Sequence, residues 1–411
     1  MTNYFQLQEN TIRGFIGSVW VRIPLLRLCT YVFFLGLTFA FLLFLVHLID
    51  TTTLQTNLQE SLRILSQEGD YPDAINGMGF TQLDNFTDKL IYEFSALHLH
   101  ASAMEAVIAP DYFRYWHGYS VYVTPLLACF EITQIRVICF VFFAVFVIYS
   151  CYIFYENFGL LASIILFISL NFPLNPLVRP WCLQFMSAPV AIFIGFICLN
   201  YLRKKHSSLI PWAFFIQGSI FAFIDFLTTP MECLGYLLIF QYLLINKETL
   251  NNQIRVLLLS IIFWCVGYFG TWSFKWFLSI LYLGPEAMDT IVSQIIYRLN
   301  GQRGEIDGLA LGFLSVAKNW KFYWLHSKGM SIVVAFLASI GILKLLWQNR
   351  ERYVLWLIPI LISLIPIAWF FVIANHSYVH AFFTNRSLGV SVCAVLVAWM
   401  VCQKRVFLGR A

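Results

Sequence analysis

Long apolar segments separated by short polar segments run through most of this chain. A helix that crosses the apolar core of a bilayer needs about 20 predominantly apolar residues. Segments near that length recur along the sequence and predict about ten transmembrane helices. The predicted spans are residues 29–49, 135–155, 158–172, 183–202, 211–229, 232–246, 256–283, 330–347, 353–374 and 387–403.

The composition agrees with a lipid environment. Hydrophobic residues make up 60% of the chain and charged residues only 11%, whereas a soluble domain has roughly 25% charged residues. Continuous apolar runs favour helices over a β-barrel, whose strands are alternating segments of about ten residues. We therefore predict an all-α integral membrane protein, with residues 1–411 in one polytopic membrane domain. The net charge of +5, without a contiguous basic stripe, excludes a nucleic-acid partner.

Basic residues identify the inner side of the membrane. Lys and Arg are enriched in short cytoplasmic loops, and here the short basic loops share one side. Both termini are then cytoplasmic, the first span is a retained signal anchor, and nearly all Asp and Glu residues lie outside. The basic residues of these short loops are Arg203, Lys204, Lys205, Lys247, Arg255, Arg350, Arg352, Lys404 and Arg405.

The first outer segment, residues 51–134, is longer than a simple connector. We expect amphipathic helices at the membrane surface within this large exoplasmic loop. Residues 84–105 predict one helix, because Asp84 is a favourable N-cap and apolar residues follow at helical spacing. A second surface helix is expected at 119–133. Residues 284–329 form the second exoplasmic loop.

The start of the first surface helix carries two carboxylates. Asp84 and Asp88 are four residues apart, so they share one helical face near the positive end of the helix dipole. This arrangement suits an anionic general base. The structural alternative is that Asp84 only caps the helix and Asp88 only complements its dipole.

Residues 111–119 (DYFRYWHGY) combine an acid, a base, an imidazole and several aromatic rings. Asp111, Arg114, His117 and Tyr119 are the candidates for chemistry or binding. Such a segment suits a sugar or lipid-phosphate site, since Arg offers a planar fork to phosphate oxygens. The alternative is an interfacial aromatic belt in which Arg114 reaches the lipid headgroups.

Asp225 lies at the outer end of the fifth predicted span. An acid close to hydrocarbon is costly to bury, and by default it indicates a functional site. A structural ion pair with Arg179 or Arg386 is the alternative interpretation.

The outer loop before the last span contains His376, His380 and Arg386. Two histidines four residues apart bind a metal or a phosphate in many sites, but this spacing alone is nonspecific without a third ligand. We assign no metal ligand and no cofactor from the sequence, and we leave a divalent metal ion open.

The order of these features resembles a known superfamily. A cytoplasmic N-terminus and one span precede a long outer loop with an acid at the start of a surface helix, then Pro125-Leu126-Leu127, then Arg136 before the next span. This layout resembles the GT-C superfamily of polytopic glycosyltransferases, such as the aminoarabinose transferases and protein O-mannosyltransferases. Residues 83–88, 115–119, 225–230 and 376–380 also resemble motifs of a bacterial family of multi-span membrane proteins.

The resemblance implies transfer of a sugar from a polyprenyl-phosphate carrier to a surface glycan, lipid or protein at the outer leaflet of a bacterial plasma (inner) membrane. Asp84 is the first candidate for the general base and Asp111 the second. Arg114, Arg386 and His376 are the candidates to stabilise the leaving phosphate. Asp225 would orient a histidine or the acceptor.

Two other classes of membrane protein are consistent with the pattern. A transporter or lipid-linked sugar flippase would place ionisable groups near the middle of the membrane, whereas the polar groups here concentrate at outer span ends. A membrane acyltransferase would place its histidine within a span, and His47 is the candidate. Membrane lipids are expected partners in every case.

Overall fold

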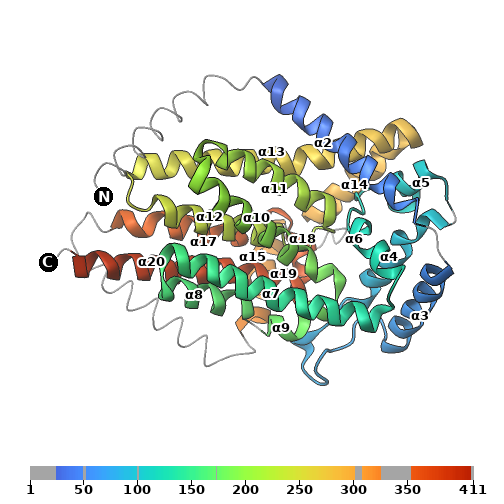
Figure 1. Cartoon of the computed structure of the whole chain (residues 1–411), viewed down its shortest axis with the longest axis horizontal. Coiled ribbons are helices and arrows are strands. Elements are labelled where there is room, and N and C mark those ends of the chain that lie inside the picture. Colours follow the sequence, from blue (N-terminus) through green and yellow to red (C-terminus); the bar gives the residue numbers. More distant parts are fainter. Residues whose placement is uncertain are drawn as a thin grey trace.

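The computed structural model describes residues 25–49, 52–99, 101–172, 174–300, 308–324 and 353–408. Every regular element within these residues is a helix, and the only β-type pairing among them is a bridge between Asp73 and Gln82. The predicted all-α class is therefore confirmed. The long helices lie roughly side by side (Figure 1).

Among the described residues, five helical segments are long and apolar enough to cross a membrane. A sixth candidate is a pair of helices bent by 44°, α8 (Leu160–Asn171) and the segment Asn175–Trp181. This is the pattern of a membrane-embedded protein, although it has fewer long spans than the ten predicted. The predicted span at 330–347 lies outside the described residues. The five segments are Arg27–Val46, Ile132–Phe158, Leu183–Lys205, Leu250–Leu283 and Ala381–Cys402.

Three predicted spans are shorter apolar helices. They are α11 (Ile210–Ile224), α12 (Pro230–Ile245) and the segment Trp356–Val372 of α17 (Tyr353–Val372). Every residue of α12 from Pro230 to Leu243 is buried. Because α12 is enclosed by other helices, its length is not set by the thickness of the lipid around it.

Surface helices gather at the end of the bundle opposite the C-terminal end of α20 (Leu388–Leu408) (Figure 1). We call this the outer end. The predicted helix at 84–105 is two helices, because Ser102 and Glu105 form a capping box that starts a new one. The predicted helix at 119–133 ends at Leu127. The helices of this end are α3 (Thr52–Glu68), α4 (Asn85–Ser95), α5 (Ala103–Ile108), α6 (Ser120–Leu127) and α14 (Glu286–Asn300).

Two buried cations fasten the first outer loop to the spanning helices. The Lys275 ammonium, on α13 (Leu250–Leu283), donates hydrogen bonds to the carbonyl oxygens of Val107 and Ile108 at 2.7 and 2.8 Å. Arg136, on α7 (Ile132–Phe158), forms a two-pronged ion pair with Glu68 at 2.6 and 2.8 Å. These contacts join the last turns of α5 and α3 to the bundle, and cations are favourable at such helix C-termini.

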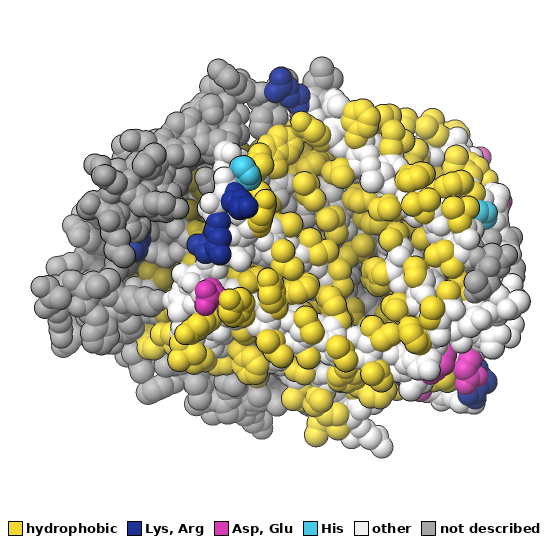
Figure 2. Space-filling view, in the orientation of Figure 1, with side chains coloured by type: hydrophobic (Ala, Val, Ile, Leu, Met, Phe, Trp, Pro, Cys, Tyr) yellow, Lys and Arg dark blue, Asp and Glu magenta, His cyan; other side chains and the backbone are white. Residues whose placement is uncertain are grey.

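Hydrophobic side chains cover most of the described surface in this view, and the few charged side chains lie toward the margins of that surface (Figure 2). Many large apolar residues of the long helices are exposed, among them Phe34, Phe41, Val141 and Ile148. Such a broad apolar surface is typical of contact with lipid rather than with water. The structure is that of an all-α membrane protein.

Helices α11 and α13 pack at unusually short range through glycines. A Cβ atom added at Gly267 would lie 2.0 Å from the Phe215 carbonyl oxygen, and one at Gly218 would lie 2.4 Å from the Trp264 carbonyl oxygen. Backbone atoms cannot withdraw as a flexible side chain can. Small residues at this crossing therefore set the distance between the two helices.

We predict that Gly267→Ala lowers the apparent unfolding temperature of the purified protein by several degrees, because overpacking costs about 1–3 kcal/mol. Thermal unfolding in detergent, followed by intrinsic fluorescence, measures this change. Gly79→Ala is the matched control, since nothing lies within 4 Å of its added Cβ atom. Equal unfolding temperatures for the two variants would show that the helix crossing tolerates a larger separation.

Candidate functional site

Asp84 begins helix α4, as predicted. Its Oδ1 atom accepts a hydrogen bond from the Thr87 backbone N–H at 2.9 Å, which makes it the N-cap. The side chain is almost fully buried, with 2% exposed. This burial raises the pKa of Asp84 to about 6. The capping role is thus confirmed, and the raised pKa is also compatible with a general base near neutral pH.

Asp88 uses both carboxylate oxygens to hold the chain just before α10 (Ser187–Lys205). Oδ2 accepts from the Leu183 backbone N–H at 3.0 Å, and Oδ1 accepts from the Gln184 backbone N–H at 3.1 Å. The Cys182 thiol adds a contact of 3.3 Å to Oδ1. Burial raises the pKa of Asp88 to about 7. Asp88 therefore fastens the first outer loop to the start of a long helix.

Asp225 plays a similar part between α11 and α12. Its Oδ1 atom accepts from the Ser187 hydroxyl at 2.6 Å, and Oδ2 accepts from the Thr228 backbone N–H at 2.7 Å. The predicted alternative of an ion pair with Arg179 or Arg386 is wrong. Arg179 instead pairs with the buried Glu232 at 2.5 Å.

His376 connects this turn to helix α14. Its Nε2–H group donates to the Leu227 carbonyl oxygen at 2.9 Å, which leaves Nδ1 to accept a hydrogen bond from the Arg298 guanidinium. Arg298 also donates to the Tyr115 hydroxyl at 3.4 Å. Burial, together with the nearby Arg298 charge, lowers the pKa of His376 well below its usual value. The imidazole is therefore neutral.

Side-chain hydrogen bonds and two backbone turns, at residues 182–187 and 225–228, link five residues that we call the outer polar chain: Asp88, Ser187, Asp225, His376 and Arg298. Asp88 of α4 accepts from two N–H groups of the turn that precedes α10, and Ser187, at the end of that turn, begins α10. Asp225 closes the turn that contains Leu227, and the Leu227 carbonyl accepts from His376. Three segments that the sequence analysis singled out separately are thus brought together by hydrogen bonds at the outer end.

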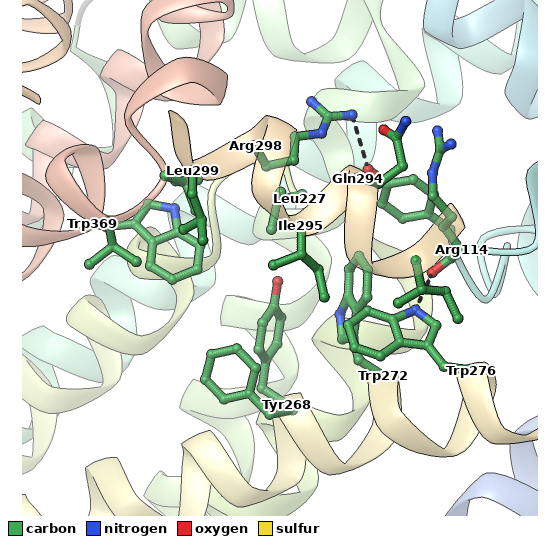
Figure 3. A pocket seen from close by; sticks show the side chains of 15 residues that line it. Arg114, Leu227, Tyr268, Trp272, Trp276, Gln294, Ile295, Arg298, Leu299 and Trp369 are labelled. Carbon is green, nitrogen blue, oxygen red and sulfur yellow. Dashed lines mark hydrogen bonds between the residues drawn. The ribbon is translucent and has the colours of Figure 1, made fainter. Parts of the chain in front are cut away.

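The outer polar chain ends at an apolar cavity of about 360 Å³. One side is aromatic and includes Tyr268, Trp272 and Trp276 of α13. Arg298 of α14 and Arg114 of the first outer loop lie along the opposite edge (Figure 3). The Trp276 indole N–H donates to the Arg114 carbonyl oxygen at 3.2 Å, which fixes the loop against α13.

The two arginines at this edge have no acidic partner within ion-pair distance in the described ranges of the chain. The Arg114 guanidinium lies over the Tyr112 ring, 4.5 Å from its centroid. The Arg298 guanidinium contacts neutral groups, His376 and Tyr115. The cavity lining thus combines an apolar interior with two arginines at one edge that have no acidic partner among the described residues.

Other predicted binding residues lie away from this cavity. His117 is buried; its Nε2–H group donates to the Tyr112 carbonyl at 3.0 Å, and its Nδ1 atom accepts from the Tyr119 hydroxyl at 2.7 Å. Burial lowers the pKa of His117 to about 3. His380 lies beside His376, with ring centroids 4.7 Å apart, and burial lowers its pKa to about 4.

Arg386 and the two candidate bases also lie outside the cavity lining. The Arg386 guanidinium is buried over the Phe185 ring, 4.2 Å from its centroid, and donates to the Phe382 carbonyl at 3.3 Å. The Asp84 carbonyl oxygen contacts the Cys182 thiol, which lies just before α10. Asp111 is exposed and lies three positions before Arg114 in the sequence. Of the residues predicted to bind substrate, Arg114 is the one that lines the cavity.

Sequence reasoning missed Arg298, which is not among the candidate residues of the sequence analysis. The signal was the amphipathic pattern of residues 286–300, in which one helical face carries Ile291, Ile295 and Arg298. As for metals, no group of three or more His, Cys, Asp or Glu side chains suited to a metal ion occurs within the described residues.

Comparison with models of protein families, with curated proteins and with solved structures found no match to this chain. The case for a function therefore depends on the cavity and on the residues that surround it.

We predict that Asp88→Asn lowers the apparent unfolding temperature, because an amide has one acceptor oxygen for two buried N–H groups, and an unsatisfied buried donor costs about 1–3 kcal/mol. The pKa of Asp88 is raised in the fold, so the folded protein binds more protons than the unfolded chain between about pH 4 and pH 7. Wild-type stability should thus fall with rising pH in this window, and less steeply in Asp88→Asn.

Thermal unfolding at pH 4.5, 6 and 7.5 checks both effects. Asp111→Asn is the matched control, since Asp111 is an exposed acid of the same loop. An Asp88→Asn protein as stable as this control at every pH would show that the turn before α10 does not need the carboxylate.

Proposed function

We propose that this protein is a glycosyltransferase of the GT-C kind, which transfers a sugar from a polyprenyl-phosphate carrier to a surface glycan, lipid or protein. The observation that carries the proposal is the aromatic cavity with Arg114 and Arg298 at its edge. Ligand sites typically have volumes of about 300–1,000 Å³, and this cavity of about 360 Å³ falls in that range. Its apolar interior suits part of a hydrocarbon chain.

The charged edge suits the phosphate of such a carrier. Arg presents a planar fork of donors that matches phosphate oxygens. Arg298 and Arg114 belong to the lining of a cavity whose surface is largely apolar, and the attraction of a cation for an anion is stronger beside apolar surface than in bulk water. These two residues therefore replace Arg386 as the first candidates to stabilise the departing phosphate.

The transfer itself requires a base. The base removes the proton of an acceptor hydroxyl, the oxygen attacks the anomeric carbon, and the sugar–phosphate bond breaks with its electron pair on the phosphate. A single displacement inverts the anomeric centre. Asp84 stays the first candidate because it is the acid at the start of the surface helix, as in the resemblance, and burial raises its pKa to about 6, which suits proton removal near neutrality. Asp111 is the second, and Asp88 is less suited because three donors already contact its carboxylate oxygens.

We further propose that the shorter helices α11, α12 and α17 also cross the membrane, that both termini are cytoplasmic, and that the protein belongs to a bacterial plasma membrane. The outer end would then face the cell exterior. The basic residues Arg203, Lys204 and Lys205 at the end of α10, away from the surface helices, support this orientation.

A transporter or flippase is the rival proposal. Transporters commonly place ionisable groups and broken helices near the middle of the membrane. In the described part of this chain, Asp88 and Arg298 instead lie on α4 and α14, which are at the outer end (Figure 1). This placement supports chemistry at one membrane face over passage through the membrane.

We predict that a deletion strain loses one sugar from a surface glycan or lipid, and that Arg298→Gln restores transfer at a rate roughly ten- to hundredfold below wild type. That range corresponds to the loss of a charge-assisted hydrogen bond, about 1.5–3 kcal/mol. Mass spectrometry of surface glycans and lipid-linked sugars, at matched membrane levels of protein, measures the transfer.

Arg63→Gln is the control for loss of one arginine, since Arg63 is exposed and pairs only with its helical neighbour Glu60 among the described residues. It should restore full transfer. An unchanged glycan profile in the deletion strain would reject the transferase and favour the transporter.

We predict that Asp84→Asn abolishes transfer and that wild-type activity rises with pH up to about 6 and then levels off. The base must be ionised, so activity falls about tenfold per pH unit below its pKa, which burial raises to about 6. Initial rates in membrane vesicles at saturating donor, from pH 4.5 to pH 8, give this profile. Full activity in Asp84→Asn together with loss of activity in Asp111→Asn would make Asp111 the base.

A further inference from the structure

The last turn of helix α14 is held from one side by two consecutive residues of α18 (Ala374–Val379). The Asn375 side-chain amide donates to the Tyr297 carbonyl oxygen at 3.0 Å. His376 accepts from Arg298 through Nδ1 and donates to the Leu227 carbonyl through Nε2. Each of the two residues therefore contacts one residue of the same turn.

This contact decides where the Arg298 guanidinium points. An arginine side chain has many rotamers, and ordering it costs up to about 2 kcal/mol of conformational entropy. His376 and Tyr115 each accept one hydrogen bond from the guanidinium and leave further N–H groups free to donate. A neutral acceptor fixes the direction of the fork without cancelling its charge, as a carboxylate would.

The position of His376 is itself determined by the outer polar chain. The Leu227 carbonyl that accepts its Nε2–H group belongs to the turn closed by Asp225, and Leu227 has a φ of 66°. A positive φ is unfavourable for a non-glycine residue, so the turn persists because surrounding contacts hold it. The turn directs the Leu227 carbonyl oxygen toward the His376 ring, where it accepts the Nε2–H hydrogen bond.

We infer that His376 is a positioning residue that holds Arg298 at the edge of the cavity as a binding fork for a lipid phosphate, with Asn375 fixing the helix that carries it. The inference rests on the proposed function for the nature of the ligand. It assigns to the histidine segment a role in phosphate recognition through a neighbouring cation, rather than through metal binding or direct contact with the sugar.

The test compares binding of farnesyl phosphate and farnesol to the full-length protein in nanodiscs, with empty nanodiscs as background. The two probes share a chain and differ in the phosphate. Wild type should bind farnesyl phosphate at least about tenfold more tightly than farnesol, as expected for a charge-assisted contact. Arg298→Gln should bring the two affinities to within about threefold of each other.

His376→Leu should lose the same phosphate preference and keep its affinity for farnesol, because the apolar part of the cavity is unchanged. Unaltered farnesol binding also shows that the variant is folded. His376→Asn is the conservative variant: its Oδ1 atom replaces Nδ1 as the acceptor for Arg298, and it should keep most of the preference. His206→Leu, which alters an exposed histidine at the C-terminal end of α10, is the control and should keep the full preference.

Three results would overturn the inference. They are a His376→Leu protein with the full phosphate preference, a His376→Asn protein that loses as much as His376→Leu, and a wild-type protein without any preference. Failure of the proposed transferase is a separate result, because a deletion strain with an unchanged glycan profile leaves this binding selectivity and its dependence on His376 intact.

Discussion

Buried backbone N–H groups at interrupted helices are the constraint on which the outer end of this protein depends. In an apolar surrounding, an unsatisfied backbone donor costs several kcal/mol. Asp88 accepts from the two N–H groups that precede α10, and Asp225 accepts from the N–H group of Thr228 between α11 and α12. These carboxylates permit the chain to turn where a straight helix would otherwise continue.

The same turns produce the site. Asp225 shapes the turn that presents the Leu227 carbonyl to His376, and His376 in turn orients Arg298 beside an aromatic cavity. Structural hydrogen bonds and the proposed phosphate contact are therefore parts of one series. Acids that the sequence marks as candidates for chemistry serve first to hold the scaffold, and the cation that faces the cavity is positioned by them.

Much of this could be predicted from the sequence, because some signals are local. Composition and apolar runs gave the all-α membrane class, and the spacing after Asp84 gave its role as the N-cap of α4. Other features depend on three-dimensional proximity. Glu232, rather than Asp225, pairs with Arg179, and Arg298 meets His376 across 78 positions of sequence. No local pattern indicates which helix faces will meet, so the cavity and its cationic edge required the structure.

The central claim is that the arginine-edged cavity binds a lipid phosphate. The most direct test is a cryo-electron microscopy structure of the protein in nanodiscs with a polyprenyl phosphate. The account predicts density for the phosphate within hydrogen-bond distance of Arg298, and for the chain against Trp272 and Trp276. A chain bound elsewhere on the molecule, or a phosphate that does not contact Arg298, would contradict it.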